Sequence, residues 1–291
     1  MLDITPNSRS LVRDNNGNDI MRIKRPLFWF LGALIAFTHA AYAHEFWVSM
    51  DKYQVETGTP MTAQLRVGEN LKGVGYPYIP DRATRFDLVI GDTVTPVEAR
   101  LGDRPALNMV APEDGLVIVV HETSDLNLIY RDLDKFRNFT THKDYPDAVD
   151  WHLARGLPDT GFKETYRRYA KALVAVGDGA GTDRAVGLKT EIVALANPYT
   201  DDLSGGLPVL VLLDGEPRPN TQVEIFAKSP DGAVQVSQIR TDDTGRAVVK
   251  VAPGVEYLLD AVVLEDTGND DPEQGAVWHS LWASLTFRVP Q

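Results

Sequence analysis

The first residues in the sequence that suggest chemistry are His44 and the adjacent Glu45, in the stretch "AYAHEFWV". His44 directly follows Ala41 and Ala43, which form the Ala-x-Ala pattern at which signal peptidases cut. Cleavage after Ala43 would make His44 the first residue of the exported chain. Its α-amine and imidazole Nδ1 would then close one chelate ring, a pair of nitrogen donors that suits Ni²⁺, Cu²⁺ or Zn²⁺.

Two donors are too few for tight metal binding, so further ligands are expected from elsewhere in the chain. Four other histidines follow residue 44, and His121 and His279 are the strongest candidates among them, with Glu45 as a carboxylate ligand. Ordinary structural roles stay open. His121 could end a strand, His279 could pack beside Trp278 at the edge of the core, and Glu45 could be the first exposed position of a strand.

The segment before His44 has the layout of a secretory signal peptide. Residues 21–43 begin with three basic residues, continue with an apolar run over residues 27–37 and end in small residues. A run of about 11 apolar residues is well short of the roughly 20 that cross a bilayer as a helix. We therefore expect removal of residues 1–43 and a periplasmic mature protein, with Met21 as the true start of translation.

The composition of the remaining 248 residues excludes several classes of function. Residues 1–43 carry five of the 29 basic and three of the 41 acidic residues, so the remainder has a net charge of about −14. Such a charge repels phosphate backbones, which argues against a nucleic-acid partner. The sequence has no cysteine, which excludes disulfides and thiolate metal sites. No later apolar run is long enough for a membrane span.

The pattern of apolar residues predicts a mainly β protein with two sandwich domains of the immunoglobulin-like or transthyretin-like kind. Residues 44–180 alternate apolar and polar positions between turn residues, as half-buried strands do, with a charged, aromatic helical insert at about 131–168. A glycine-rich linker at 181–187 follows. Residues 188–291 then consist of short, regularly spaced strands, as in a second β-sandwich.

One hairpin of the second domain is specific. In "TDDTGRAVVKV" the residues Asp243-Thr244-Gly245 make the tight turn, with Gly245 supplying a positive φ, and Ala247 and Val249 alternate inward. Together with "LPVLVLLDGEPRPNTQVEIF" and "YLLDAVV", this pattern resembles the transthyretin-like, Cna-B-like class of small β-sandwich.

Dispersed motifs over residues 43–290 extend the resemblance to the whole exported chain. They are "AHEFWV", "RVGENLKG", "YPYIPDR", "YRRYAKALVAVGDG", "VALANPY", "RTDDTGRA" and "WASLTF". Together they resemble the exported bacterial family catalogued as domain of unknown function 4198. Some members of that family carry the label "nickel or cobalt transport, periplasmic component", which adds cobalt to the metals expected here and implies a metal transporter as partner.

Enzymatic motifs are absent from the sequence. It has no Gly-x-Ser-x-Gly elbow, no His-Glu-x-x-His and no nucleotide fingerprint, so we expect a protein that is not an enzyme. The aromatic side chains of the insert could close a pocket or could attach the insert to the first sheet, and attachment is favoured.

Two functions follow from the sequence. The first is a periplasmic metal-binding protein, accessory to uptake of nickel, cobalt or another divalent transition metal, with His44 as its anchor. The second is a non-metal binding or adaptor module that takes a small ligand or another envelope protein.

Overall fold

The computed structural model describes residues 12–13, 19–20 and 44–291 of the chain. The first two segments are the short paired strands β1 (Val12–Arg13) and β2 (Asp19–Ile20). The predicted signal peptide, its cleavage site and the start at Met21 lie outside the described residues. All other elements belong to a compact unit that includes residues 44–291.

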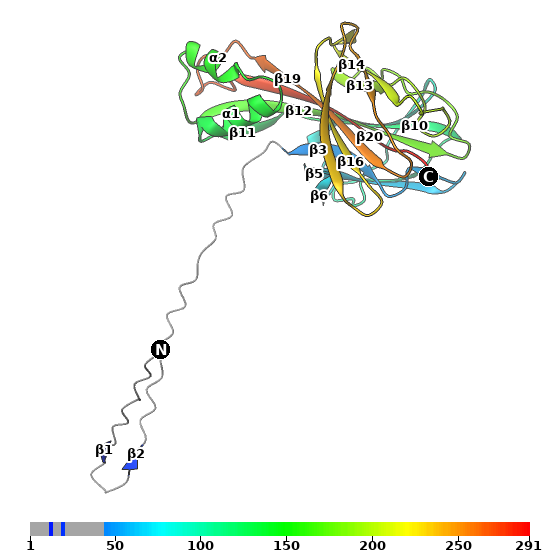
Figure 1. Cartoon of the computed structure of the whole chain (residues 1–291), viewed down its shortest axis with the longest axis horizontal. Coiled ribbons are helices and arrows are strands. Elements are labelled where there is room, and N and C mark those ends of the chain that lie inside the picture. Colours follow the sequence, from blue (N-terminus) through cyan, green and yellow to red (C-terminus); the bar gives the residue numbers. More distant parts are fainter. Residues whose placement is uncertain (1–11, 14–18, 21–43) are drawn as a thin grey trace, which may run out of the picture. The chain divides into compact units, whose positions relative to one another are not determined.

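A ten-stranded sheet runs through this unit (Figure 1). Eight strands follow one another in the order β17 (Val234–Arg240), β16 (Gln222–Lys228), β19 (Glu256–Asp266), β20 (Trp278–Arg288), β12 (Phe162–Val176), β10 (Gly115–Thr123), β7 (Ala83–Ile90) and β8 (Thr93–Pro96). Two more, β11 (Leu126–Tyr130) and β4 (Gln54–Val55), pair with β12. The parallel pairing of β12 with β20 joins strands of both predicted domains in one sheet. The division into two domains joined by a linker at 181–187 stays a prediction.

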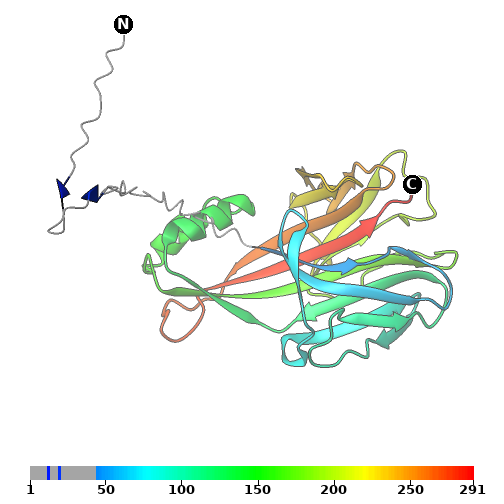
Figure 2. The same cartoon turned by 90° about the horizontal axis from the view of Figure 1, so that it is seen from below.

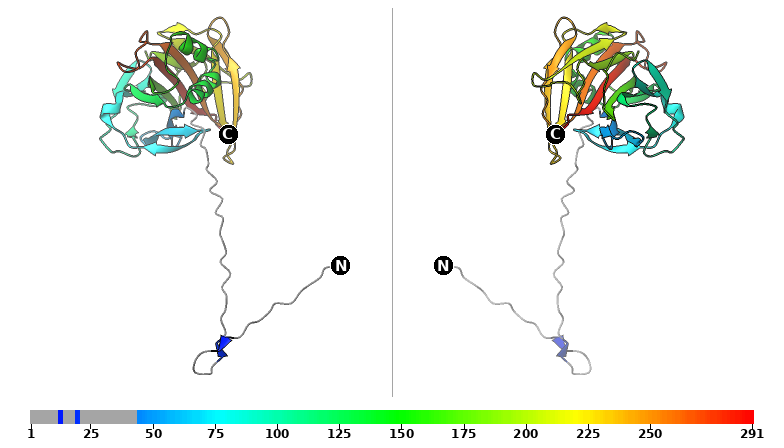
Figure 3. Two further views of the ribbon diagram at one scale, coloured as in Figure 1. Left: turned by 90° about the vertical axis from the view of Figure 1, so that its left-hand side faces the viewer. Right: turned by 90° about the vertical axis from the view of Figure 1, so that its right-hand side faces the viewer.

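Two four-stranded sheets cover the ten-stranded sheet. One consists of β3 (Glu45–Met50), β5 (Pro60–Glu69), β6 (Lys72–Tyr76) and β9 (Leu107–Val110). The other consists of β13 (Thr190–Ala194), β14 (Leu207–Leu213), β15 (Glu216–Pro217) and β18 (Arg246–Val249). Figure 2 and the end-on views of Figure 3 show the blue-to-cyan strands of the first half and the yellow strands of the second on different sides of the unit.

Strand β10 explains how one sheet supports two cores. Its residues Val117 and Val119 face the core under β3 and β5, whereas Leu116, Ile118 and Val120 face the core under β13 and β14. A strand that is buried on both faces has a continuous run of apolar residues, as the "LVIVV" of residues 116–120 does.

The helical insert lies at one end of the long strands (Figure 1). It holds α1 (Leu133–His142), whose N-cap Asp132 accepts a hydrogen bond from the Asp134 amide, and α2 (Ala148–Ala154). From Phe162 onward the predicted insert is strand β12. The aromatic side chains of the insert pack on β19 and β20 around Trp278 and Trp282, so they attach the insert to the sheet.

These observations confirm a mainly β fold with sandwich packing and a short helical insert. The predicted hairpin is also confirmed, since Gly245 has φ +74° and Ala247 and Val249 are buried. Among residues 12–13, 19–20 and 44–291, no helix has both the length and the apolar character needed to span a bilayer.

A buried ammonium group ties the insert to three strands. Lys143, the residue after α1, is 4 % exposed. Its Nζ lies 2.7 Å from Glu224 on β16, 2.8 Å from Asp260 on β19 and 3.4 Å from Glu45 on β3. All three carboxylates are buried. Because the ammonium contacts carboxylates of three strands at once, its removal would leave buried charge with fewer partners, and the Lys143 cluster therefore holds these elements together.

We expect Lys143→Ala to lower the free energy of unfolding by about 3–5 kcal/mol, the usual cost of removing one partner from a buried ion pair. Lys189→Ala is the matched control, because the Lys189–Asp214 pair is exposed on both sides and should contribute less than about 1 kcal/mol. Urea unfolding of both variants measures the difference. Equal losses in the two variants would contradict the role given to Lys143.

Candidate functional site

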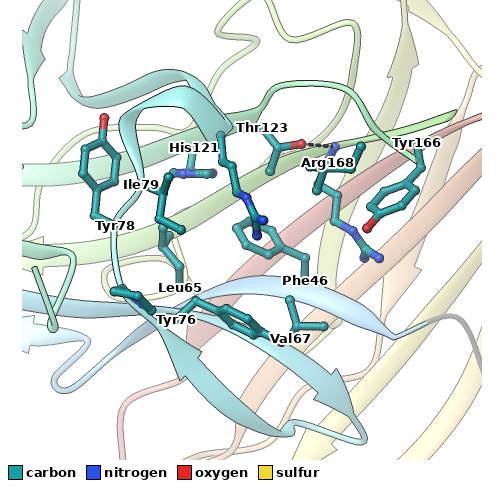
Figure 4. A pocket seen from close by; sticks show the side chains of 13 residues that line it. Phe46, Leu65, Val67, Tyr76, Tyr78, Ile79, His121, Thr123, Tyr166 and Arg168 are labelled. Carbon is teal, nitrogen blue, oxygen red and sulfur yellow. Dashed lines mark hydrogen bonds between the residues drawn. The ribbon is translucent and has the colours of Figure 1, made fainter. Parts of the chain in front are cut away.

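The structure contains a cavity of about 190 Å³ between β3, β5 and β6 on one side and β10 and β12 on the other. Its walls are mostly apolar and aromatic. The lining residues are Phe46, Leu65, Val67, Tyr76, Pro77, Tyr78, Ile79, Arg82, His121, Thr123, Leu126, Tyr166 and Arg168. Figure 4 shows His121 and Thr123 across from Tyr76 and Val67, with Arg168 beside Tyr166.

One wall of the cavity is the segment between β6 and β7, which ends in the 3₁₀ turn Pro80–Arg82. The backbone of Tyr78 exchanges two hydrogen bonds of 2.9 Å with Gly102 and Asp103. At the other end of the segment, the Arg82 carbonyl accepts a hydrogen bond of 3.1 Å from the Ser124 amide. The Tyr78 ring also stacks on Phe86. These contacts hold the wall in place without a ligand.

Arg168 brings a positive charge to the cavity from β12. Its amide donates to the Thr123 hydroxyl at 3.0 Å, and its Nη1 donates to the backbone carbonyl of His44 at 2.6 Å. The guanidinium lies 4.6 Å from the ring centre of Trp282 and 5.2 Å from that of Tyr166. Burial lowers the pKa of Arg168 from its ordinary value, which still leaves the group charged at neutral pH.

Arg82 supplies a second guanidinium, and the lining residues include no aspartate or glutamate. Arg82 is exposed and makes no ion pair with any carboxylate of the described residues. The chain as a whole carries a net charge of −12. A cavity with two arginines and no carboxylate is therefore a local reversal of the protein's charge, and it favours an anionic ligand.

His121 lines the same cavity from β10. The side chain is 3 % exposed, and its ring packs on Phe46 and Phe86 with centroids 5.3 and 5.2 Å away. Burial lowers the pKa of His121 to about 3, so the ring is neutral at physiological pH.

His44 lies beside the cavity at the start of β3. Side chains alternate along a strand, so His44 shares a face of β3 with Phe46, and Glu69 shares a face of β5 with Val67. The His44 Nε2 is 3.7 Å from the Glu69 Oε1, and both side chains are exposed. The structure therefore places the predicted anchor beside a carboxylate that the sequence analysis did not select.

The side chains of Glu45 and His279 lie apart from the His44–Glu69 pair. Glu45 is on the opposite face of β3 and contacts Lys143. His279 on β20 pairs with Thr165 of β12, whereas His121 pairs with Ala170, five residues further along β12. That offset is about 16 Å along the strand. His121 and His279 are therefore too far apart to share a metal ion, and His279 Nδ1 instead lies 3.7 Å from Glu265.

Within the described part of the chain, no group of three or more histidine, aspartate or glutamate side chains is arranged to hold a metal ion. Metal binding by His44 stays a prediction. Cleavage after Ala43 would give His44 a free α-amine, which is a metal donor in addition to these side chains. Sequence reasoning missed Arg82, Arg168 and two of the three carboxylates around Lys143, because it selected only Glu45, and selected it as a metal ligand. A usable signal existed for two of them, because Glu224 in "VEIF" and Asp260 in "LLDAVV" are acidic residues inside apolar strands.

The model of the family described as "Domain of unknown function (DUF4198)" matches residues 41–265. A search of curated proteins returned no match.

Solved structures that are similar to this chain include the following two. The D0–D1 domain of intimin is 15% identical over 84% of this chain and 97% of its own, with a TM-score of 0.22. A tetra-tandem repeat in the extending region of a large adhesion protein is 10% identical over 95% of this chain and 55% of its own, with a TM-score of 0.21.

The stability of the protein should depend on the protonation of Glu45. Burial raises the pKa of Glu45 from 4.5 to about 7, and the charges of Asp260 and Glu224 act in the same direction. The folded state thus holds this proton more tightly than the unfolded state does. The contribution of Glu45 to the free energy of unfolding is therefore greatest below about pH 4.5 and decreases as the pH rises to about 7.

We expect Glu45→Gln to flatten the decrease in unfolding free energy between pH 5 and pH 8. Hydrogen bonding to Glu224 raises the pKa of His142, which gives a slope of the same sign. Both proteins should therefore carry His142→Gln, and urea unfolding at each pH measures the slope. An unchanged slope in the Glu45→Gln variant would contradict this assignment.

Proposed function

The chain belongs to the family described as "Domain of unknown function (DUF4198)", and from that premise and the geometry of its cavity we propose that it is a binding protein for a small anionic ligand. The proposal includes export to the periplasm, as the sequence predicts, and a binding role without catalysis. The observation that carries it is the pair Arg82 and Arg168 in a cavity without carboxylates, within a strongly acidic protein.

The walls of the cavity determine the size and the apolar character of the ligand. Phe46, Leu65, Val67 and Tyr76 give it an apolar and partly aromatic lining. Small-molecule sites are commonly built in this way, from apolar walls with a few placed polar groups. A volume of about 190 Å³ is below the roughly 300–1,000 Å³ of drug-sized sites. We therefore propose a compact ligand with one carboxylate on an apolar ring, of the size of benzoate.

The two arginines have different roles in this proposal. Arg168 is buried and fixed by His44, Thr123 and the aromatic rings beside it, so it is preorganised for the anion. Arg82 is exposed at the end of the anchored segment and can close on a bound carboxylate from the solvent side. Because Arg168 also supports the backbone of His44, Arg82 is the better residue to change in a test.

We expect benzoate to bind the chain from His44 onward with a dissociation constant between about 10 µM and 1 mM, as suits so small a ligand. Arg82→Gln should weaken binding at least about tenfold, because a hydrogen bond to a charged group is lost. Arg246→Gln, an exposed arginine on β18, is the control and should leave binding unchanged. Isothermal titration measures all three proteins. Absence of binding, or equal affinity in the Arg82 variant, would sink the proposal.

Metal binding at the mature N-terminus is a second candidate, and the proximity of His44 to Glu69 favours it. After cleavage the α-amine and Nδ1 of His44 would bind the metal, and the Glu69 carboxylate, whose Oε1 lies 3.7 Å from the other ring nitrogen Nε2, would accept the Nε2–H and orient the ring. Arg168 fixes the backbone at this point by its hydrogen bond to the His44 carbonyl. Water or a transport partner would complete the coordination of Ni²⁺, Co²⁺, Cu²⁺ or Zn²⁺.

An alanine inserted before His44 separates the two candidates. The extra residue moves the α-amine away from the imidazole and leaves every side chain in place, so it should abolish metal binding and spare benzoate binding. Glu69→Gln should weaken metal binding about tenfold or more, since the carboxylate that orients the metal-binding imidazole is lost. Isothermal titration with each metal provides the measurement. Metal affinity that is indifferent to the added alanine would exclude His44 as the anchor.

A further inference from the structure

The fold gives His121 no polar partner. Its Nδ1 is completely enclosed and has no hydrogen-bond partner among the described residues. The neighbouring side chains that contact its ring are Phe46, in a tilted arrangement, and Phe86, at 75°. Burying a polar atom without a partner destabilises a protein, and a phenylalanine at this position would avoid that loss. Packing alone therefore does not account for a histidine here.

The surroundings determine which nitrogen carries the proton. A neutral imidazole has one N–H group and one acceptor nitrogen. An enclosed N–H without an acceptor is the rarer and costlier arrangement, whereas a lone pair can rest against the positive edges of aromatic rings. Nδ1 is therefore the acceptor nitrogen. Nε2 carries the proton, and it is the nitrogen that a ligand can reach, because His121 lines the cavity and Nε2 is not enclosed as Nδ1 is.

The strand register gives the backbone spacing between His121 and Arg168 along the sheet. His121 pairs with Ala170, and Ala170 is two residues beyond Arg168 on β12. That step is about 7 Å along the strand. A benzene ring with substituents at opposite ends spans a similar length, so one such ligand can extend along the strands from the level of Arg168 to the level of His121.

We propose that His121 donates its Nε2–H to the ligand, and that the ligand is an aromatic carboxylate with an oxygen acceptor at the end of the ring away from the carboxylate. This inference rests on the proposed function, because it assumes that the arginines hold the carboxylate. His121 then determines which aromatic acids are selected, and its unpaired state in the free protein is the cost of that selectivity.

Two benzoates of the same size test the inference. The ether oxygen of 4-methoxybenzoate can accept a hydrogen bond, whereas the corresponding methylene of 4-ethylbenzoate cannot. Isothermal titration of the chain from His44 onward should show a preference of about two- to tenfold for the methoxy compound, the effect of one neutral hydrogen bond. His121→Phe should bind both compounds with equal affinity, and should unfold at the same or a higher urea concentration than the parent.

The outcomes separate the inference from the proposed function. No preference in the parent, or a preference that survives in His121→Phe, would overturn the role of His121 while the binding function stands. Failure of both benzoates to bind would overturn the proposed function. Nitrogen NMR of the imidazoles then still tests His121, with His121→Leu as the control that assigns its signals. A neutral ring protonated on Nε2 at pH 6 is expected, and a proton on Nδ1 or a charged ring would overturn the inference.

Discussion

The ion pairs of Lys143 are the constraint on which the rest of the structure depends. The ammonium joins the end of α1 to β3, β16 and β19 through three buried carboxylates. Burying these charges is costly, and their contacts with one another and with His142, which lies 3.0 Å from Glu224, offset that cost. Glu45 is one of the three, and the next residue of β3, Phe46, lines the cavity from the other face of the strand. The cluster therefore fixes the strand that forms both the cavity wall and the predicted mature N-terminus.

Charge is distributed unevenly around this strand. The carboxylates of Glu45 and Asp260 stabilise the cation of Arg168 from a distance, so part of its charge is already compensated within the fold. Arg82 has no such neighbour among the carboxylates of the described residues. A bound anion would gain most from Arg82, and would meet in Arg168 a group that is already oriented. This division explains how a protein of net charge −12 can present a cationic cavity.

The sequence predicted what depends on local patterns. The alternation of apolar residues identified the strands, and Gly245 identified a hairpin because a tight turn needs a positive φ. The charged, aromatic composition of the insert identified a helical segment, which holds α1 and α2. The parallel pairing of β12 with β20 was not predicted, because those strands lie more than 100 residues apart and no local pattern encodes their register.

The same limit applies to the site. Chemical type selected the histidines as candidate ligands, but strand register decides which of them can meet. It places His121 in the cavity and His279 about 16 Å further along the sheet. The cavity is lined by segments from residue 46 to residue 168. Its charge therefore cannot be predicted without knowing how the strands pair. The enclosed state of His121 Nδ1 likewise follows from Phe46 and Phe86, which are distant in sequence.

A crystal structure of the chain from His44 onward, grown with 4-methoxybenzoate, tests the central claim most directly. The account predicts one ligand in the cavity, with its carboxylate between Arg82 and Arg168 and its ether oxygen within hydrogen-bond distance of His121 Nε2. A cavity that holds only water at saturating ligand, or a ligand bound elsewhere, would contradict it.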